Sequence, residues 1–211
     1  MKISIKNVSK VYKNTSVLNN INYNFSEGKI YAIKGDNGSG KTLLLKTVSG
    51  LLKPDEGEVY IDDKQLYKNI DFCDKLGALI ETPDFIPNIS GYKNLKCIGL
   101  LKRKASDDDI KKAMSAFDLD SESKLHVSKY SLGMKQKLGI ASVIMESPEV
   151  LILDEPANAL DSESLNKLTE ILCDLKSKNK LIIIAYHNCE ELDSIADVTL
   201  DIKSGRINYE E

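Results

Sequence analysis

Gly35-Asp36-Asn37-Gly38-Ser39-Gly40-Lys41-Thr42 follows a short apolar run, Ile30 to Ile33, and precedes a helical pattern that extends to Val48. The octet matches GxxxxGKT, in which glycines let backbone N–H groups turn inward around phosphate oxygens. A helix that begins near Lys41 adds the positive end of its dipole. Lys41 is placed to reach the β- and γ-phosphates of a nucleotide, and the Thr42 hydroxyl is placed to ligate Mg²⁺. We therefore predict a phosphate-binding loop between a strand and a helix.

A second stretch supplies carboxylates for the same site. Residues 150–153 are four apolar residues that predict a buried strand, and Asp154 and Glu155 follow at its carboxyl end. Open α/β sheets bind ligands at that end of their strands. We expect Asp154 in the Mg²⁺ shell and Glu155 beside the attacking water, because phosphoryl transfer depends mainly on positioning and charge stabilisation. An apolar strand ending in Asp-Glu is weak evidence alone, and the phosphate-binding loop makes it strong.

The remaining pattern places these motifs in an α/β fold. Period-two alternation between Ile3 and Phe25 predicts strands. Further strands are expected at 58–61, 76–80, 181–185, 198–202 and 206–209, and helices at 162–176 and 190–196. Apolar strands alternating with helices indicate a parallel sheet covered on both faces. The predicted fold class is α/β, a P-loop NTPase with a mainly parallel sheet core, an antiparallel β edge subdomain and an inserted helical subdomain at about 88–145.

The composition limits the classes of partner. A formal charge of −3 gives no basic footprint, so no nucleic acid is expected. Four cysteines without a CxxC pair argue against zinc or a disulfide framework, and predict buried, reduced thiols. The N-terminus lacks the apolar region of a signal peptide, and the longest apolar stretch, Leu181 to Tyr186, is too short for a membrane span. Any membrane-spanning part is therefore expected on another chain.

One further motif narrows the class of ATPase. Tyr130-Ser131-Leu132-Gly133-Met134-Lys135-Gln136 lies just before an amphipathic helix. Here the chain resembles the ABC ATPase family, whose signature has the form LSGGQ. Tyr12, the segment Asn158-Ala159-Leu160-Asp161 and His187 also match the family's motifs in order and spacing. The resemblance covers nearly the whole chain and implies a single ABC ATPase domain over residues 1–211.

The resemblance implies a role for each matching residue. Tyr12 would stack on adenine, with a ring that only covers a strand edge as the alternative. His187 would contact the γ-phosphate, with a core histidine as the alternative. Ser131 and Gly133 would contact the γ-phosphate held by a partner subunit, so the resemblance implies a homodimer or heterodimer around the nucleotides. The expected sets are Lys41, Glu155 and His187 for catalysis; Thr42, Glu81 and Asp154 for Mg²⁺; and Tyr12, Gly35, Asp36, Asn37, Gly38, Ser39, Gly40, Lys41, Thr42, Glu81, Ser131, Gly133 and Asp161 for binding ATP.

The chain departs from the family at several positions. Glu81 stands where most transport ATPases of the family have glutamine, and this resembles the bacitracin and lantibiotic export and immunity branch. An anionic oxygen binds a metal more strongly than an amide does, but it repels the γ-phosphate. Leu132 replaces the first signature glycine, and Ala157 and Ala159 replace residues that are usually Thr and Gly. Because the residues expected for catalysis are all present, we expect a competent active site; they are Lys41, Asp154, Glu155 and His187.

Three functions compete at this stage. The leading hypothesis is an ATP-hydrolysing subunit on the cytoplasmic side of the membrane that drives a separate permease, with an antimicrobial peptide as the transported molecule. A soluble ABC ATPase in DNA repair or translation is the main alternative, but such proteins usually contain two domains or a long coiled coil. A nucleotide-binding module without turnover is the third, and the presence of Glu155 argues against it.

Overall fold

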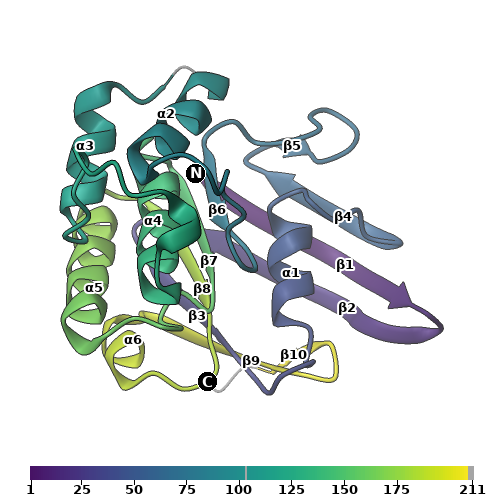
Figure 1. The fold of residues 1–211 in the computed structure, drawn as a ribbon. Coiled ribbons are helices and arrows are strands. Elements are labelled where there is room, and N and C mark those ends of the chain that lie inside the picture. Colours follow the sequence, from purple (N-terminus) through teal and green to yellow (C-terminus); the bar gives the residue numbers. More distant parts are fainter. Residues whose placement is uncertain (103, 209–211) are drawn as a thin grey trace.

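The computed structural model of the protein describes residues 1–102 and 104–208 (Figure 1). The elements, in chain order, are β1 (Lys2–Tyr12), β2 (Thr15–Ser26), β3 (Ile30–Lys34), α1 (Lys41–Val48), β4 (Glu56–Ile61), β5 (Lys64–Gln65), β6 (Leu76–Leu79), α2 (Gly91–Lys102), α3 (Asp107–Ser115), the short 3₁₀ helix η1 (Val127–Lys129), α4 (Leu132–Ile144), β7 (Val150–Asp154), α5 (Ser162–Ser177), β8 (Leu181–Ala185), α6 (Glu190–Ile195), β9 (Val198–Lys203) and β10 (Arg206–Asn208).

A six-stranded sheet forms the centre of the molecule, with the strand order β10-β9-β3-β8-β7-β6. The strands from β9 to β6 are parallel, and β10 adds an antiparallel edge. The order brings β3 and β7 to either side of β8. The loops that follow these strands therefore meet at one edge of the sheet, as parallel strands require. This confirms the predicted α/β fold class with a mainly parallel core.

Two hydrophobic cores lie on opposite faces of this sheet. On one face, Leu151, Leu153 and Ile182 pack with the helices α2 to α6. On the other face, Ile152 and Ile183 pack with α1 and the N-terminal strands. Successive residues of a strand point to opposite faces, so an unbroken apolar run such as β7 fills both cores. Figure 1 shows α1 between the two sheets.

The N-terminal strands form a second, antiparallel sheet with the order β2-β1-β4-β5. Its inward residues, including Ile3, Ile5 and Phe25, are almost fully buried against the second core. This is the predicted antiparallel β edge, and it carries Tyr12 at the end of β1. The expected helices also lie between β6 and β7, where α2, α3 and α4 are found. Their assignment to a separate subdomain at 88–145 remains a prediction.

Other expectations need correction or lie outside the described residues. The thiols are free, but they are not buried, because Cys97 and Cys173 are exposed and Cys73 and Cys189 are only partly buried. In α5 the inward face is formed by Leu168, Leu172 and Leu175, and helical periodicity places Cys173 on the opposite side. The last strand was expected to reach Tyr209, which lies outside the described residues. No helix within residues 1–102 and 104–208 is long and apolar enough to cross a membrane.

Candidate nucleotide site

The phosphate-binding loop, residues 35–42, lies between β3 and α1, and its lysine is folded back onto it. Lys41 is the first residue of α1 and its side chain is only 6% exposed. Its Nζ donates to the carbonyl oxygens of Gly35, at 2.7 Å, and Asp36, at 3.2 Å. Nζ also lies 3.9 Å from Glu155 Oε1. An ammonium group held this way points toward the space enclosed by the loop and the end of β7.

Thr42 and Asp154 join the loop to β7. The Thr42 hydroxyl donates to Asp154 Oδ2 at 2.7 Å. The other oxygen, Asp154 Oδ1, is buried and has no hydrogen-bond partner, and Ser39 Oγ is in the same condition. Burial raises the pKa of Asp154, while the Thr42 hydrogen bond and Lys41 lower it by less. A buried carboxylate oxygen without a hydrogen-bond partner destabilises a fold and is rare, so it indicates that a ligand binds there.

These residues fit a Mg²⁺ ion that is held together with a nucleotide. Mg²⁺ is usually bound through one or two carboxylates plus substrate phosphates, and not by a cage of protein side chains alone. Asp154 offers the partnerless oxygen and Thr42 offers a hydroxyl beside it. Within the described part of the chain, no group of three or more His, Cys, Asp or Glu residues could hold a metal by itself. Asp154 and Thr42 therefore fit a Mg²⁺ site that is completed by the phosphates of a nucleotide.

Glu155 has an unusual backbone conformation. Its φ is +47°, in the left-handed region that a residue with a Cβ rarely adopts. Its N–H donates to Ala185 O at 2.7 Å, and its carbonyl accepts from Gln136 Nε2 at 3.4 Å. Burial raises the pKa of its carboxyl and Asp154 adds to this, while Lys41 and the backbone N–H of His187 lower it. Strain of this kind is concentrated at functional sites, and the sequence gives no sign of it.

His187 lies beside Glu155 at the end of β8. Its side chain is exposed, so the alternative of a core histidine is wrong. The buried position belongs to the preceding residue, Tyr186, whose hydroxyl donates to Asp193 Oδ1 at 2.6 Å. Asp193 also pairs with Lys34 Nζ at 2.5 Å. Lys34, which precedes the phosphate-binding loop, and Tyr186, which precedes His187, are therefore linked through Asp193 of α6. Sequence reasoning missed this connection because Lys34 is distant from the other two residues in the chain.

Glu81 reaches the edge of the same site. It lines a cavity of about 380 Å³ together with Asp154, Glu155 and Leu132. Its φ is +64°, its side chain is 63% exposed, and its Oε1 lies 2.7 Å from Lys46 Nζ. The structure therefore pairs the carboxylate with a lysine on α1. Lys46 has no shared sequence pattern with Glu81, and it partly neutralises the charge that would repel a phosphate.

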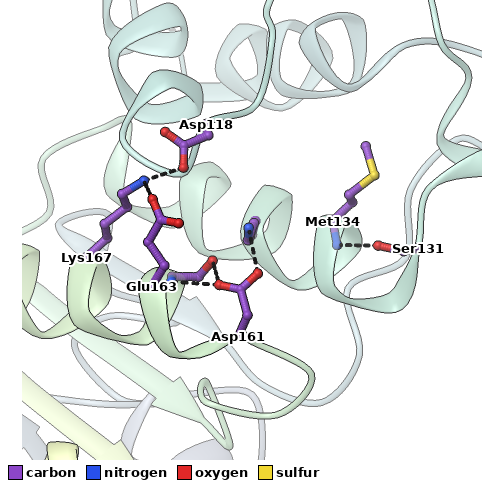
Figure 2. Close-up of polar contacts among 8 residues, drawn as sticks. Asp118, Ser131, Met134, Asp161, Glu163 and Lys167 are labelled. Atoms are coloured by element: carbon purple, nitrogen blue, oxygen red, sulfur yellow. Dashed lines mark hydrogen bonds and ion pairs between the residues drawn. The ribbon is translucent and has the colours of Figure 1, made fainter.

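Ser131 and Asp161 have structural partners of their own. Ser131 is the N-cap of α4 and accepts from Met134 N at 3.1 Å, and Asp161 is the N-cap of α5 and accepts from Ser164 N at 2.8 Å (Figure 2). Gly133 lies close to the segment before α5, since a Cβ there would be 2.6 Å from Ala159 O. Among the described residues, no hydrogen bond joins Ser131 or Asp161 to the phosphate-binding loop.

Tyr12 is 62% exposed, with Lys13 Nζ 5.7 Å from its ring centroid. A ring that only covers a strand edge would lose more of its surface, so this exposure favours an aromatic face that is open to a ligand. The chain thus brings together residues 35–42, Glu81, Asp154, Glu155 and His187. Tyr12, Ser131 and Asp161 are exposed, and Gly133 is partly buried beside Ala159. The roles of these residues in binding and catalysis remain predictions.

Comparisons with known proteins agree on one family. The family described as ABC transporter matches residues 18–158. The ABC transporter ATP-binding protein YybJ of Bacillus subtilis, itself named uncharacterized, is 42% identical over 99% of this chain and 96% of its own length. The bacitracin transport ATP-binding protein BcrA of Enterococcus faecalis is 40% identical over 93% of this chain, which covers 64% of BcrA. The lantibiotic transport ATP-binding protein SrtF of Streptococcus pyogenes is 35% identical over 99% of this chain and 90% of its own length.

Solved structures give the same result. The dimeric structure of MJ0796, a bacterial ABC transporter cassette, has a TM-score of 0.88 and 27% identity, and the match covers 99% of this chain and 97% of that chain. The same cassette in a dimeric post-hydrolysis state bound to ADP and Pi has a TM-score of 0.88 and 25% identity over the same shares. Both structures are dimers of ATP-binding cassettes with the fold described above.

Proposed function

Because this chain belongs to the ABC transporter family of ATP-binding proteins, we propose that two copies, or one copy and a related subunit, enclose ATP and drive a separate membrane permease. The chain is an ATP-hydrolysing subunit of a transporter. The observation that most strongly supports the proposed active site is the junction of Lys41, Thr42, Asp154 and Glu155 at one edge of the central sheet. The dimer is supported by the dimeric cassettes of known structure that this chain resembles. It is also supported by the exposed position of Ser131, which no hydrogen bond among the described residues joins to the phosphate-binding loop.

The chemistry follows from where each side chain lies. Lys41 Nζ would leave the carbonyl oxygens of Gly35 and Asp36 for the β- and γ-phosphates, which are stronger partners for an ammonium group. Thr42 and Asp154 would hold Mg²⁺, which when bound neutralises charge on the phosphates. Glu155, beside Lys41 and the His187 N–H, would orient the attacking water. His187 would contact the γ-phosphate from the end of β8.

Phosphate release by the purified protein tests the active site. Glu155→Gln removes the carboxylate and keeps the side-chain volume, and we expect it to abolish release while ATP still binds. Glu149→Gln is the matched control, because Glu149 is a surface residue that pairs with Lys75 at 2.9 Å outside this junction. ATP with Glu155→Gln should also produce a dimer in size-exclusion chromatography. Full release by Glu155→Gln would overturn the assignment of the water-orienting carboxylate.

We further propose that the transported molecule is an antimicrobial peptide and that the protein sits against the inner face of the cell membrane, docked on its permease. The relatives BcrA and SrtF and the acidic residue Glu81 support this substrate class. The test is expression in a sensitive host together with a candidate multi-span permease from the same genome, followed by growth in bacitracin and in a lantibiotic. Resistance that is lost in Glu155→Gln is the expected result. Co-purification with ribosomes or DNA and not with a polytopic membrane protein would favour the soluble class of ABC ATPase.

Glu81 is the proposed link between the nucleotide and the permease. It reaches the cavity beside Asp154 and Glu155, yet most of its side chain remains exposed to a partner. Glu81→Ala should therefore reduce resistance more than it reduces ATP turnover by the isolated subunit. If turnover and resistance both stayed at the wild-type level, the role of Glu81 would be abandoned.

A further inference from the structure

The turn between β9 and β10 lies directly against the phosphate-binding loop. The N–H of Gly205 donates to the carbonyl oxygen of Ser39 at 3.1 Å, and its own carbonyl accepts from Asn19 N at 2.8 Å. One residue near the end of the described chain therefore joins three segments, namely the loop, strand β2 and the β9–β10 hairpin. No residue of this hairpin belongs to the nucleotide site as it has been described so far.

Backbone atoms approach so closely at this junction that side chains are excluded. Gly205 has φ +72°, and a Cβ there would lie 2.5 Å from the carbonyl oxygen of Val17. A Cβ on Gly35 would lie 2.3 Å from the carbonyl oxygen of Ile202 in β9. Both contacts are with backbone, which cannot rotate away as a side chain can. The hairpin is therefore packed against the loop at two points.

The hydrogen bond from Gly205 fixes the plane of one peptide unit in the loop. The Ser39 carbonyl and the Gly40 N–H belong to the same planar, trans peptide, so they point in opposite directions. Holding the carbonyl toward Gly205 therefore sets the direction of the Gly40 N–H. Loops of this kind bind phosphate through such N–H groups, and affinity depends on their being oriented before the ligand arrives.

We propose that Gly205 is a positioning residue for nucleotide binding, which holds the Ser39–Gly40 peptide in the orientation that receives the phosphates. The inference rests on the proposed role of residues 35–42. Alanine at position 205 would move the turn out of the left-handed region, withdraw the donor from Ser39 and leave the loop in several conformations. A smaller population of the competent loop weakens the apparent affinity by the same factor.

Gly28→Ala is a closely matched control for Gly205→Ala. Gly28 has φ +74°, donates its N–H to the carbonyl oxygen of Lys180 at 3.0 Å, and would bring a Cβ within 2.7 Å of Asn179 Oδ1. It shares the left-handed backbone and a donated hydrogen bond, although the atom it would meet belongs to a side chain. It lies in the turn between β2 and β3, and its hydrogen bond and nearest contact are with Lys180 and Asn179, not with the phosphate-binding loop. The two variants separate a general loss of stability from an effect on nucleotide.

The experiment measures the Kd for a fluorescent ATP analogue, displacement by ATP and ADP, and steady-state ATP hydrolysis. For Gly205→Ala we expect Kd and KM to rise roughly tenfold and kcat at saturating ATP to stay within about twofold, since only the population of the competent loop falls. Gly28→Ala should lower stability to urea with an unchanged Kd. Equal Kd values in the two variants would overturn the proposal, as would a loss confined to kcat.

Two additional experiments test the role of the phosphate-binding loop and cover the case in which Gly205→Ala does not fold. Lys41→Ala should abolish binding of the analogue, and unchanged binding would remove the proposed role of the loop itself, and this inference with it. If Gly205→Ala does not fold, hydrogen exchange of the wild-type protein decides. ADP should then slow exchange in residues 198–208 but not in residues 26–30, which contain Gly28. Equal or absent slowing in the two segments contradicts the proposal.

Discussion

Replacing Thr42 by valine removes one hydroxyl and leaves the shape of the side chain almost unchanged. In the wild-type protein this hydroxyl donates to Asp154 Oδ2 at 2.7 Å, and Oδ1 of the same carboxylate has no partner. The substitution therefore leaves a carboxylate that is only 7% exposed without any hydrogen-bond donor. A hydrogen bond to a charged group contributes about 1.5–3 kcal/mol. We expect the free energy of unfolding at pH 7, without nucleotide, to fall by about 2 kcal/mol.

Thr47→Val provides the matched control within the same helix. Thr47 is fully buried and donates to the carbonyl oxygen of Leu43 at 2.8 Å, a neutral acceptor that also has a backbone donor in the helix. Loss of this bond should lower the free energy of unfolding by about 1 kcal/mol or less. Urea unfolding followed by circular dichroism measures both variants. Thr42→Ser keeps the hydroxyl and should recover most of the loss.

The two variants also differ in activity. Thr42→Val should lose phosphate release even where it remains folded, because the hydroxyl is a proposed Mg²⁺ ligand, and Thr47→Val should keep it. A Thr42→Val protein that is no less stable than Thr47→Val would refute the reasoning about the buried carboxylate. Equal activity of the two would instead refute the role of Thr42 at the metal.

Three further outcomes are expected. Partial burial raises the pKa of Asp197, but Lys176 and the backbone N–H of Ile30 lower it more, so the net shift is downward. The carboxylate therefore stabilises the fold above its ordinary pKa, and this contribution is lost as the pH falls through the lowered value. Asp197→Asn should cost about 1 kcal/mol at pH 7 in urea titrations, and this cost should shrink steadily as the pH falls below the ordinary pKa of an aspartate. Glu155→Gly relieves a φ of +47° and should raise the free energy of unfolding by up to about 1 kcal/mol while ending ATP turnover. Ala159→Gly, at φ +62°, should give the same gain in stability with turnover retained. A Glu155→Gly protein that is less stable than the wild type would contradict the proposed strain. Phe117→Ala, at a position 1% exposed in the core beneath α3, should destabilise by about 3–5 kcal/mol in calorimetry, and a loss below about 1 kcal/mol would show that its ring contributes little.

Much of the fold could be predicted because its signals are local. The apolar runs of β7 and β8 and the helical pattern of α1 are set by periodicity over a few residues, and the observed bounds agree with the expected ones to within one residue. The phosphate-binding loop and the carboxylates after β7 were also visible, because their residue types and order are tied to the chemistry they serve. These features predicted the fold class and the family, and the structure and the comparisons confirmed both.

What could not be predicted depends on contacts between distant segments. The pairing of Glu81 with Lys46 and the bond from Gly205 to Ser39 join residues that have no shared pattern in the sequence. The left-handed backbone of Glu155 accompanies hydrogen bonds to Ala185 and Gln136, which are distant in the chain. Glutamate has no intrinsic preference for this conformation, so the sequence does not indicate it. Cys97 was expected to be buried because cysteines are buried on average. That expectation was wrong, since Cys97 lies on an exposed face of α2, and which face of a helix is buried depends on the residues around it.

The two cores of the central sheet have a consequence for how the molecule opens. β7 and β8 each contribute side chains to both cores. Unfolding of either core therefore exposes strands that also form part of the other core. Amide protons of these strands should therefore exchange with solvent only through complete unfolding, while β5 and β10, which lie at sheet edges, exchange through small local openings. The carboxylates proposed for catalysis should thus follow the most slowly exchanging segment of the described chain, whereas the hairpin proposed to position the phosphate-binding loop should end at one of the fastest.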